Sequence, residues 1–242
     1  MILHDLERDS FSAFAGPRRE EFDMVMPAAV LGRDQLGHVV ILERFFHSPV
    51  KTLLSAFTDE EFVRHMVARR ECLRAYGAHN SKVQGKRLYK NISIIDLSGI
   101  GWAHLTDKRY HARMKAFNSV FSECYPETTC KLVLINAPRV FAALWNLAKR
   151  FIHPVTAEKV KVVSSSDARK LFGDLGVTLD DGVELGPNGK LPQPGGPGKA
   201  PVWFDLYLQL RADYAASEEM GLLSKGFVPE EDMKALEALA GR

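Results

Sequence analysis

The sequence predicts an α/β fold in which helices flank a mostly parallel sheet, and three observations support this prediction. A near-continuous β-branched run at 91–100, NISIIDLSGI, is typical of a strand buried on both faces. An amphipathic helical pattern at 107–124 and a second apolar run at 131–136, KLVLIN, follow it. Strand, helix and strand in this order predict a βαβ unit, in which the two strands lie parallel.

The segment before this unit predicts a hairpin and a long helix. Asp34 to Gly37 has the composition of a turn, and it leads into an apolar strand from His38 to Leu42, with His38 at the strand edge. Residues 48–54 are expected to form a loop. A helix from Thr58 to about Gly77 is predicted, because Thr58-Asp-Glu-Glu61 has the form of a capping box.

The two faces of this helix are expected to differ. Its inward face would carry Phe62, Met66, Val67, Leu73 and Tyr76. The basic residues Arg64, Arg69 and Arg70 are interpreted as a solvated outer face rather than a binding patch. Residues 78–87 would then form a polar connection to the next strand.

Prolines and glycines divide the rest of the chain. A wide apolar helical stripe at 139–152 lies between Pro138 and Pro154, and Pro154 is placed to open a short second helix. A strand is predicted over Val160 to Val163 and a helix over Ser166 to Phe172. The Gly/Pro-rich stretch 191–200 ends the domain, and two helices are predicted beyond it, at 201–220 and 229–240.

Composition and motifs exclude several classes of function. The net charge of +2 makes nucleic acid an unpromising partner, because its binding relies on a concentrated basic patch. The three cysteines lack metal-ligand spacing, and the eight histidines form no metal-binding pair. No nucleophile elbow, zinc-protease motif or phosphate loop is present, so we expect no catalytic site, metal or cofactor. We also expect no signal peptide and no membrane span, as in a cytoplasmic protein with reduced thiols.

Three short motifs stand in a distinctive order. They are YPE at 125–127, NAP at 136–138 and HPVTAEK at 153–159. This order closely resembles the CRAL-TRIO lipid-binding domain family of phosphatidylinositol/phosphatidylcholine transfer proteins, from about Met26 to about Gly196. The resemblance implies the CRAL-TRIO fold, in which flanking helices and a mixed, mostly parallel sheet floor enclose an apolar cavity. It also implies a domain over 24–200, with the remnant of a helical lobe at 1–23 and a C-terminal helical extension at 201–242.

In this family the helix matching 139–152 is a mobile gate over the cavity, and flanking prolines are where a hinge is expected. Burying one methylene group contributes about 0.8 kcal/mol of transfer free energy, so an acyl chain of ~16 carbons gains roughly 13 kcal/mol when it is removed from water. A protein that takes such a chain from a bilayer therefore needs a closed apolar site. An open gate must expose apolar residues to a bilayer. The residues expected to make this membrane contact are Leu144, Trp145, Leu147, Phe151 and Ile152.

The resemblance also implies two polar ends of the site. In family members that bind phosphatidylinositol, the positions matching Glu127, Thr156 and Lys159 contact the headgroup. The family's hydroxyl contacts to a second lipid match Asn91 and Ser93. An aromatic that members use near a choline headgroup would lie at Val40, which has no ring to hold a quaternary ammonium, so we do not expect phosphatidylcholine.

Three hypotheses follow for the function. The first is a monomeric, peripherally membrane-associated protein that binds a phospholipid, phosphatidylinositol above others, or a similar hydrophobic ligand, and transfers or presents it between membranes. The second is a regulatory or scaffolding module that keeps the fold without the cargo. The third, an enzyme on the same frame, has no nameable nucleophile or base. A cavity of several hundred Å³ behind the helix at 139–152 would favour the first and a filled core the second.

Overall fold

The computed structural model describes residues 18–138, 141, 145, 157–163, 168–180, 183–185 and 191. A six-stranded sheet forms the centre of this region, in the order β5-β4-β3-β2-β1-β6. Its strands are β1 (Ala28–Arg33), β2 (Val39–Glu43), β3 (Asn91–Asp96), β4 (Thr129–Ile135), β5 (Val160–Val163) and β6 (Thr178–Leu179). The four strands from β2 to β5 are mutually parallel, whereas β1 lies antiparallel to β2 and β6. The predicted α/β class with a mixed, mostly parallel sheet is confirmed.

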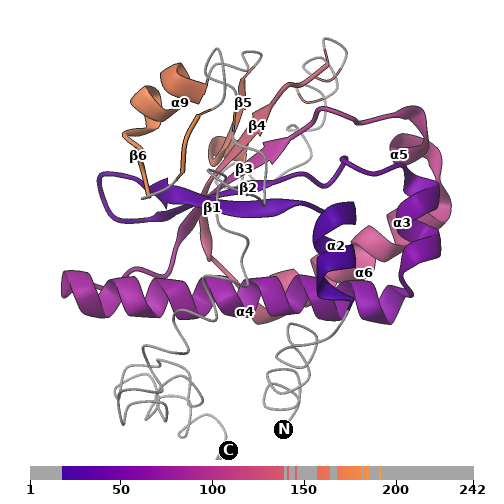
Figure 1. Cartoon of the computed structure of the whole chain (residues 1–242), viewed down its shortest axis with the longest axis horizontal. Helices are drawn as coiled ribbons and strands as arrows, with labels where there is room; N and C mark the ends of the chain where they lie inside the picture. The colour runs from indigo at the N-terminus through magenta and orange to yellow at the C-terminus, as the bar shows by residue number, and fades with distance from the viewer. Residues whose placement is uncertain are drawn as a thin grey trace, which may run out of the picture.

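Helices cover both faces of this sheet (Figure 1). They are α2 (Arg19–Val25), α3 (Val50–Ala56), α4 (Asp59–Gln84), α5 (Trp102–Thr106), α6 (Lys108–Cys124) and α9 (Ala168–Leu175). Figure 1 shows α4 running along the whole width of the sheet on one side, with α9 on the other. The α6 crossover joins β3 to β4 as the sequence predicts, and Asp107 caps its start by accepting from the amides of Arg109 and Tyr110.

Strand alternation divides the buried side chains between the two faces. The α9 face buries Val40, Leu42, Ile92, Ile94, Val133 and Ile135 against Leu171, Phe172 and Leu175. The α4 face buries Val30, Val39 and Ile41 against Ala68, Cys72, Leu73 and Tyr76. A third cluster, rich in phenylalanine, joins α2, α3, α4 and α6 beyond the ends of the strands. The inward face predicted for α4 is therefore confirmed.

The α4 helix differs from the prediction at its far end. The sequence predicts a connection over residues 78–87, but the helix continues through residues 78–84 and ends at Gly85 in the left-handed conformation (φ +61°). Gly77 does not stop the helix. An added Cβ at Gly77 would lie 3.0 Å from the Leu88 carbonyl oxygen, so this glycine serves the close approach of the following segment. Ser81 Oγ accepts from the Leu88 amide at 2.7 Å and fixes that approach.

Two further predictions in this part of the chain are wrong. Residues 48–54 are not a loop, since α3 begins at Val50 and buries Val50 and Leu53. Arg69 and Arg70 are not on a solvated face: Arg69 pairs with Asp23 at 2.5 Å, and its side chain is only 8% exposed. Of the three arginines, only Arg64 lies in solvent. The capping box between Thr58 and Glu61 is confirmed, with both hydrogen bonds present.

A histidine in the third cluster gives the stability of the fold a defined pH dependence. His65 stacks on Phe22 at 4.5 Å, and burial, followed by the nearby Arg69 cation, lowers its pKa from 6.5 to about 4. The folded protein therefore keeps His65 neutral where the unfolded chain takes up a proton. Stability from this group is complete above pH 6.5 and is lost as the pH falls towards about 4. Urea titrations across this range should show that the free energy of unfolding depends less steeply on pH in His65→Phe than in the wild type, because the variant lacks the one proton that the unfolded wild type takes up. Equal slopes would contradict the assignment.

Candidate functional site

Charged side chains stand immediately before three neighbouring parallel strands. Lys90 precedes β3, Glu127 lies just before β4, and Lys159 precedes β5. Lys159 Nζ donates to Glu127 Oε2 at 2.8 Å, although the two residues are 32 positions apart in the chain. The structure thus brings together two of the three residues predicted to bind a headgroup. The third, Thr156, lies outside the described residues.

The backbone holds Glu127 in an unusual conformation. Its φ angle is +57°, in the left-handed region that a residue with a side chain seldom occupies. The Lys159 ammonium lowers the pKa of the Glu127 carboxyl through their hydrogen bond and charge, and Lys90 contributes to the same shift. Backbone strain of this kind persists where the surrounding structure over-determines it, as it does at binding sites.

A pocket of about 320 Å³ lies beside this pair, on the α4 face of the sheet. Its apolar wall is contributed by the sheet residues Ile95, Leu132 and Val160 and by Phe117 and Phe121 of α6. Glu127 and Lys159 line it together with Thr128 and Thr129. The site is therefore an apolar hollow with one carboxylate and one ammonium at its rim.

A chain of polar groups runs from the sheet to α4, and three of its members, Ser93, Glu43 and Arg70, line the pocket. Asn91 Nδ2 donates to Ser93 Oγ at 3.1 Å, and Ser93 Oγ donates to Glu43 Oε2 at 3.2 Å. Arg70 Nη2 then donates to Glu43 Oε1 at 2.9 Å. Both ends of this ion pair are buried, with side chains 10% and 7% exposed. The predicted second-lipid contacts Asn91 and Ser93 therefore already belong to a network in which Ser93 contacts a charge.

Aromatic rings complete the wall around Arg70. The Arg70 guanidinium lies 4.5 Å from the centroid of the Phe121 ring, which stacks on Tyr125 at 5.9 Å. Tyr125 Oη donates to Glu71 Oε1 at 2.5 Å, and burial raises the pKa of this hydroxyl well above its usual value. The first residue of the YPE motif thus anchors the pocket wall to α4.

Sequence reasoning missed Glu43 and Arg70 as pocket residues. A signal was present, because Arg70 is four residues after Met66 and three before Leu73, both on the inward face of the helix. Val40, by contrast, lies in the core on the α9 face, so it does not face the pocket. The β2 residue that does line the pocket is Glu43.

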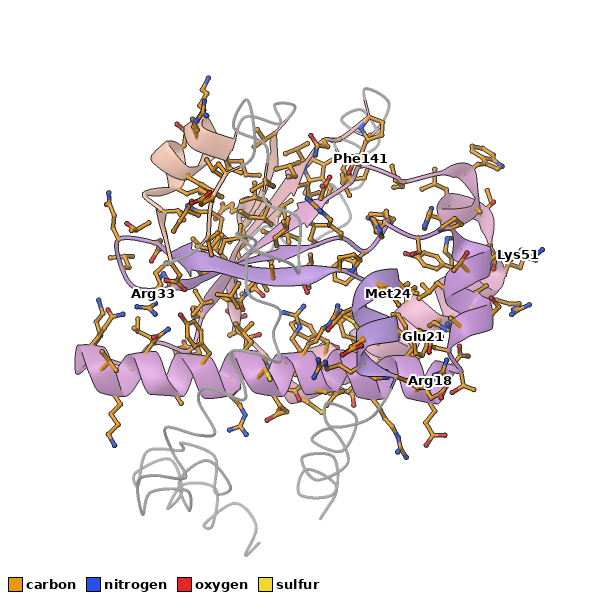
Figure 2. The ribbon with its side chains drawn as sticks, in the orientation of Figure 1. Arg18, Glu21, Met24, Arg33, Lys51 and Phe141 are labelled. Atoms are coloured by element: carbon orange, nitrogen blue, oxygen red, sulfur yellow. The ribbon has the colours of Figure 1, made fainter. Side chains whose placement is uncertain are left out.

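Most of the predicted gate lies outside the described residues. These residues are Leu144, Leu147, Phe151 and Ile152, and only Trp145 of the gate set is described, as a partly exposed helical residue. Phe141, which is also partly exposed, is labelled beyond the end of β4 in Figure 2. Among the described residues, no group of three or more His, Cys, Asp or Glu side chains could hold a metal ion. Within the same residues, no helix combines the length and apolar character needed to cross a bilayer.

Comparisons with known proteins agree with this architecture. The CRAL/TRIO domain model matches residues 24–176. The phosphatidylinositol/phosphatidylcholine transfer protein SFH9 of Arabidopsis thaliana is 28% identical over 221 residues, covering 86% of this chain and 37% of that protein. The SEC14 cytosolic factor of Yarrowia lipolytica is 27% identical over 161 residues, covering 65% of this chain and 32% of that protein.

Among solved structures, Sfh5 has the same fold, with a TM-score of 0.51 and 21% identity over 81% of this chain and 66% of that one. The chain spans between about a quarter and somewhat over a third of the length of the curated relatives that it matches. Because the family model covers well over half of the 242 residues, the chain belongs to the CRAL/TRIO domain family.

Proposed function

We propose that this protein binds a phospholipid, phosphatidylinositol above others, in a gated apolar cavity and transfers it between membranes or presents it at one. The observation that supports this most directly is the Glu127–Lys159 pair at the rim of an apolar pocket. The ammonium suits the phosphate of an inositol lipid, and the carboxylate can accept hydrogen bonds from ring hydroxyls. Relatives with matching sequences carry phosphatidylinositol/phosphatidylcholine transfer in their names.

Arg70 argues against phosphatidylcholine as the second cargo. Inside the pocket, away from the rim, a quaternary ammonium would seek a carboxylate such as that of Glu43 and an aromatic face such as that of Phe121. The Arg70 guanidinium already occupies both, at 4.5 Å from the Phe121 ring centroid and 2.9 Å from Glu43 Oε1. A second cation there would meet like-charge repulsion. We therefore propose an uncharged apolar or hydroxyl-bearing lipid for this end.

Lipid extraction tests the proposal. Protein purified without detergent should release phospholipid into organic solvent, with phosphatidylinositol enriched over its share of the host lipids, as measured by mass spectrometry. It should also move labelled phosphatidylinositol from donor to acceptor vesicles. Absence of lipid in the extract, together with no transfer, would refute the proposal.

A regulatory or scaffolding module is the second candidate function, and one observation favours it. The described pocket, at about 320 Å³, is near the lower end of the 300–1,000 Å³ typical of ligand sites, and a buried ion pair forms part of its lining. Such a module would give the negative result of the extraction experiment while folding normally. Several relatives are named as transfer proteins and none of those names is that of an enzyme, so catalysis is not proposed.

Several features are proposed along with this function. We propose a monomer that is cytoplasmic and associates transiently with membranes through Leu144, Trp145, Leu147, Phe151 and Ile152. We also propose three parts of the chain: a segment at 1–23, a domain over 24–200 and an extension at 201–242.

A further inference from the structure

One stretch of the chain is strongly basic although the whole protein is nearly neutral. From Cys72 to Ile95 there is no Asp or Glu, whereas five Lys or Arg residues occur. Three of them, Lys86, Arg87 and Lys90, lie in the connection from α4 to β3. Together with Val83 and Tyr89 they form what we term the basic edge patch.

The patch combines unneutralised charge with exposed apolar surface. Lys86 and Arg87 are exposed and Lys90 is partly so, and none of the three pairs with a carboxylate among the residues the structure describes. Val83 is 68% exposed and Tyr89 is 49% exposed. Two cations contact the Tyr89 ring: the Arg87 guanidinium lies 4.7 Å from the ring centroid and the Lys90 ammonium lies 5.5 Å from it.

The position of the patch relates it to the candidate site. The patch begins at the C-terminal end of α4 and lies at the edge of the sheet where β3, β4 and β5 begin (Figure 1). Lys90 is close enough to Glu127 to help lower the pKa of its carboxyl. The patch also borders a second pocket, of about 230 Å³, which Arg87, Tyr89, Leu73 and Asn91 help to line.

One residue that lines this second pocket, Asn91, has a buried polar atom without a partner among the described residues. Asn91 is only 2% exposed, and its side-chain oxygen forms no hydrogen bond within the described part of the chain. A buried acceptor left unsatisfied is costly, so a donor supplied from outside would stabilise it. The hollow beside Tyr89 and Arg87 therefore has a volume of about 230 Å³ and borders a residue with a buried oxygen that the described residues leave unsatisfied, which marks it as a place where part of a lipid headgroup could be accommodated.

We propose that the basic edge patch docks this protein on a bilayer that contains anionic phospholipid, with the Glu127–Lys159 rim turned towards that membrane. Lys86, Arg87 and Lys90 contact lipid phosphates, and Tyr89 and Val83 enter the interface between headgroups and acyl chains. A tyrosine suits that depth because its ring is apolar and its hydroxyl remains in water.

The composition of the patch favours a membrane over a nucleic acid. Proteins that bind nucleic acid neutralise about six to ten phosphates, which exceeds what three cations supply. An exposed valine also has no role against a phosphate backbone, whereas an interface between headgroups and hydrocarbon accepts it. The inference rests on the proposed function only in expecting that the rim should face a membrane.

Sedimentation of the full chain with vesicles tests the patch. The probes are vesicles of phosphatidylcholine alone and of phosphatidylcholine with phosphatidylserine, without inositol lipid, so that binding does not depend on cargo. The wild type should bind the anionic vesicles and be released as salt approaches about 1 M, where the screening length falls to ~3 Å. The triple variant Lys86→Gln, Arg87→Gln, Lys90→Gln should lose about fivefold in partitioning per charge, and roughly a hundredfold in all.

A matched variant controls for the loss of net charge. Lys51→Gln, Lys108→Gln, Lys115→Gln removes three exposed cations from α3 and α6, and Figure 2 shows Lys51 at the end of the molecule where α3 lies. This control should bind anionic vesicles within a few-fold of the wild type. Tyr89→Ala should weaken binding while leaving its salt dependence unchanged, since the charges remain.

Three results would overturn the inference: equal binding by the patch variant and the wild type, equal losses in the patch and control variants, or displacement of the protein from vesicles by RNA at matched phosphate concentration. Each of these would leave lipid extraction untouched. Conversely, a protein that binds anionic vesicles through the patch but yields no extracted lipid would refute the proposed cargo and support the docking surface.

Discussion

Replacing Arg70 with leucine is expected to destabilise the protein by about 3–5 kcal/mol, because it leaves the Glu43 carboxylate buried without a partner. Glu43 is only 5% exposed, and its second oxygen has one weak donor, the Ser93 hydroxyl at 3.2 Å. A buried carboxylate without a cation must either be desolvated at a large cost or take up a proton. The free energy of unfolding in urea measures the loss.

The double variant Glu43→Leu, Arg70→Leu distinguishes the net contribution of the ion pair to stability from the cost of leaving one buried charge without its partner. Replacing a buried ion pair with apolar residues of similar volume is often neutral or stabilising by about 1–4 kcal/mol, so this variant should recover most of the loss. Arg64→Leu is the matched control on the same helix, since Arg64 is 44% exposed and pairs with the exposed Glu60; its effect should be within about 0.5 kcal/mol. A single Arg70→Leu variant as stable as this control would show that water reaches Glu43.

Such a result would also bear on what the pair does in the pocket. If the double variant is as stable as the wild type, a contribution to stability does not explain why an ion pair is present in an apolar pocket. A role in ligand selection then becomes the better account, and the double variant should accept cargo that Arg70 repels. Extraction of phosphatidylcholine by the double variant, but not by the wild type, would support this role.

The sheet was predictable from the sequence because strand identity depends on local pattern. β3, β4 and β5 each coincide with an apolar, β-branched run, and a parallel βαβ crossover constrains how such runs pair. The two-residue β6 has no such pattern, since it consists of Thr178 and Leu179 alone. Its pairing depends on Gly32, where an added Cβ would lie 2.0 Å from the Thr178 carbonyl oxygen. A contact of that kind between distant segments leaves no periodic signal.

The candidate site was predictable only in part, for a similar reason. Glu127 and Lys159 precede adjacent parallel strands, so their meeting follows once the strand order β5-β4-β3 is known. The Glu43–Arg70 pair instead depends on how α4 is rotated against β2, a tertiary property. A charged residue on an inward helical stripe is usually read as outward-facing, and that default is wrong for Arg70 because a partner carboxylate lies opposite.

Lys159→Ala is expected to reduce phosphatidylinositol binding and transfer by about tenfold to a hundredfold, since hydrogen bonds to charged groups contribute about 1.5–3 kcal/mol. Lys159 Nζ donates a hydrogen bond to Glu127 Oε2 at 2.8 Å, and we expect a lipid phosphate to replace Glu127 as the acceptor from this ammonium. Glu127 is 67% exposed, so water can solvate its carboxylate when Lys159 is removed, and the fold should be unaffected.

Lys161→Ala provides the matched control for this loss of charge. Lys161 lies two residues after Lys159, within β5; it is 50% exposed and pairs with Asp174 of α9 at 3.6 Å rather than lining the pocket. Removing it should leave transfer of labelled phosphatidylinositol between vesicles within about twofold of the wild type, as expected for a screened surface charge. Transfer at the wild-type rate by Lys159→Ala would show that the headgroup does not contact this lysine. Equal losses in both variants would instead assign the effect to bulk charge at the membrane, where the basic edge patch rather than the Glu127–Lys159 rim would be acting.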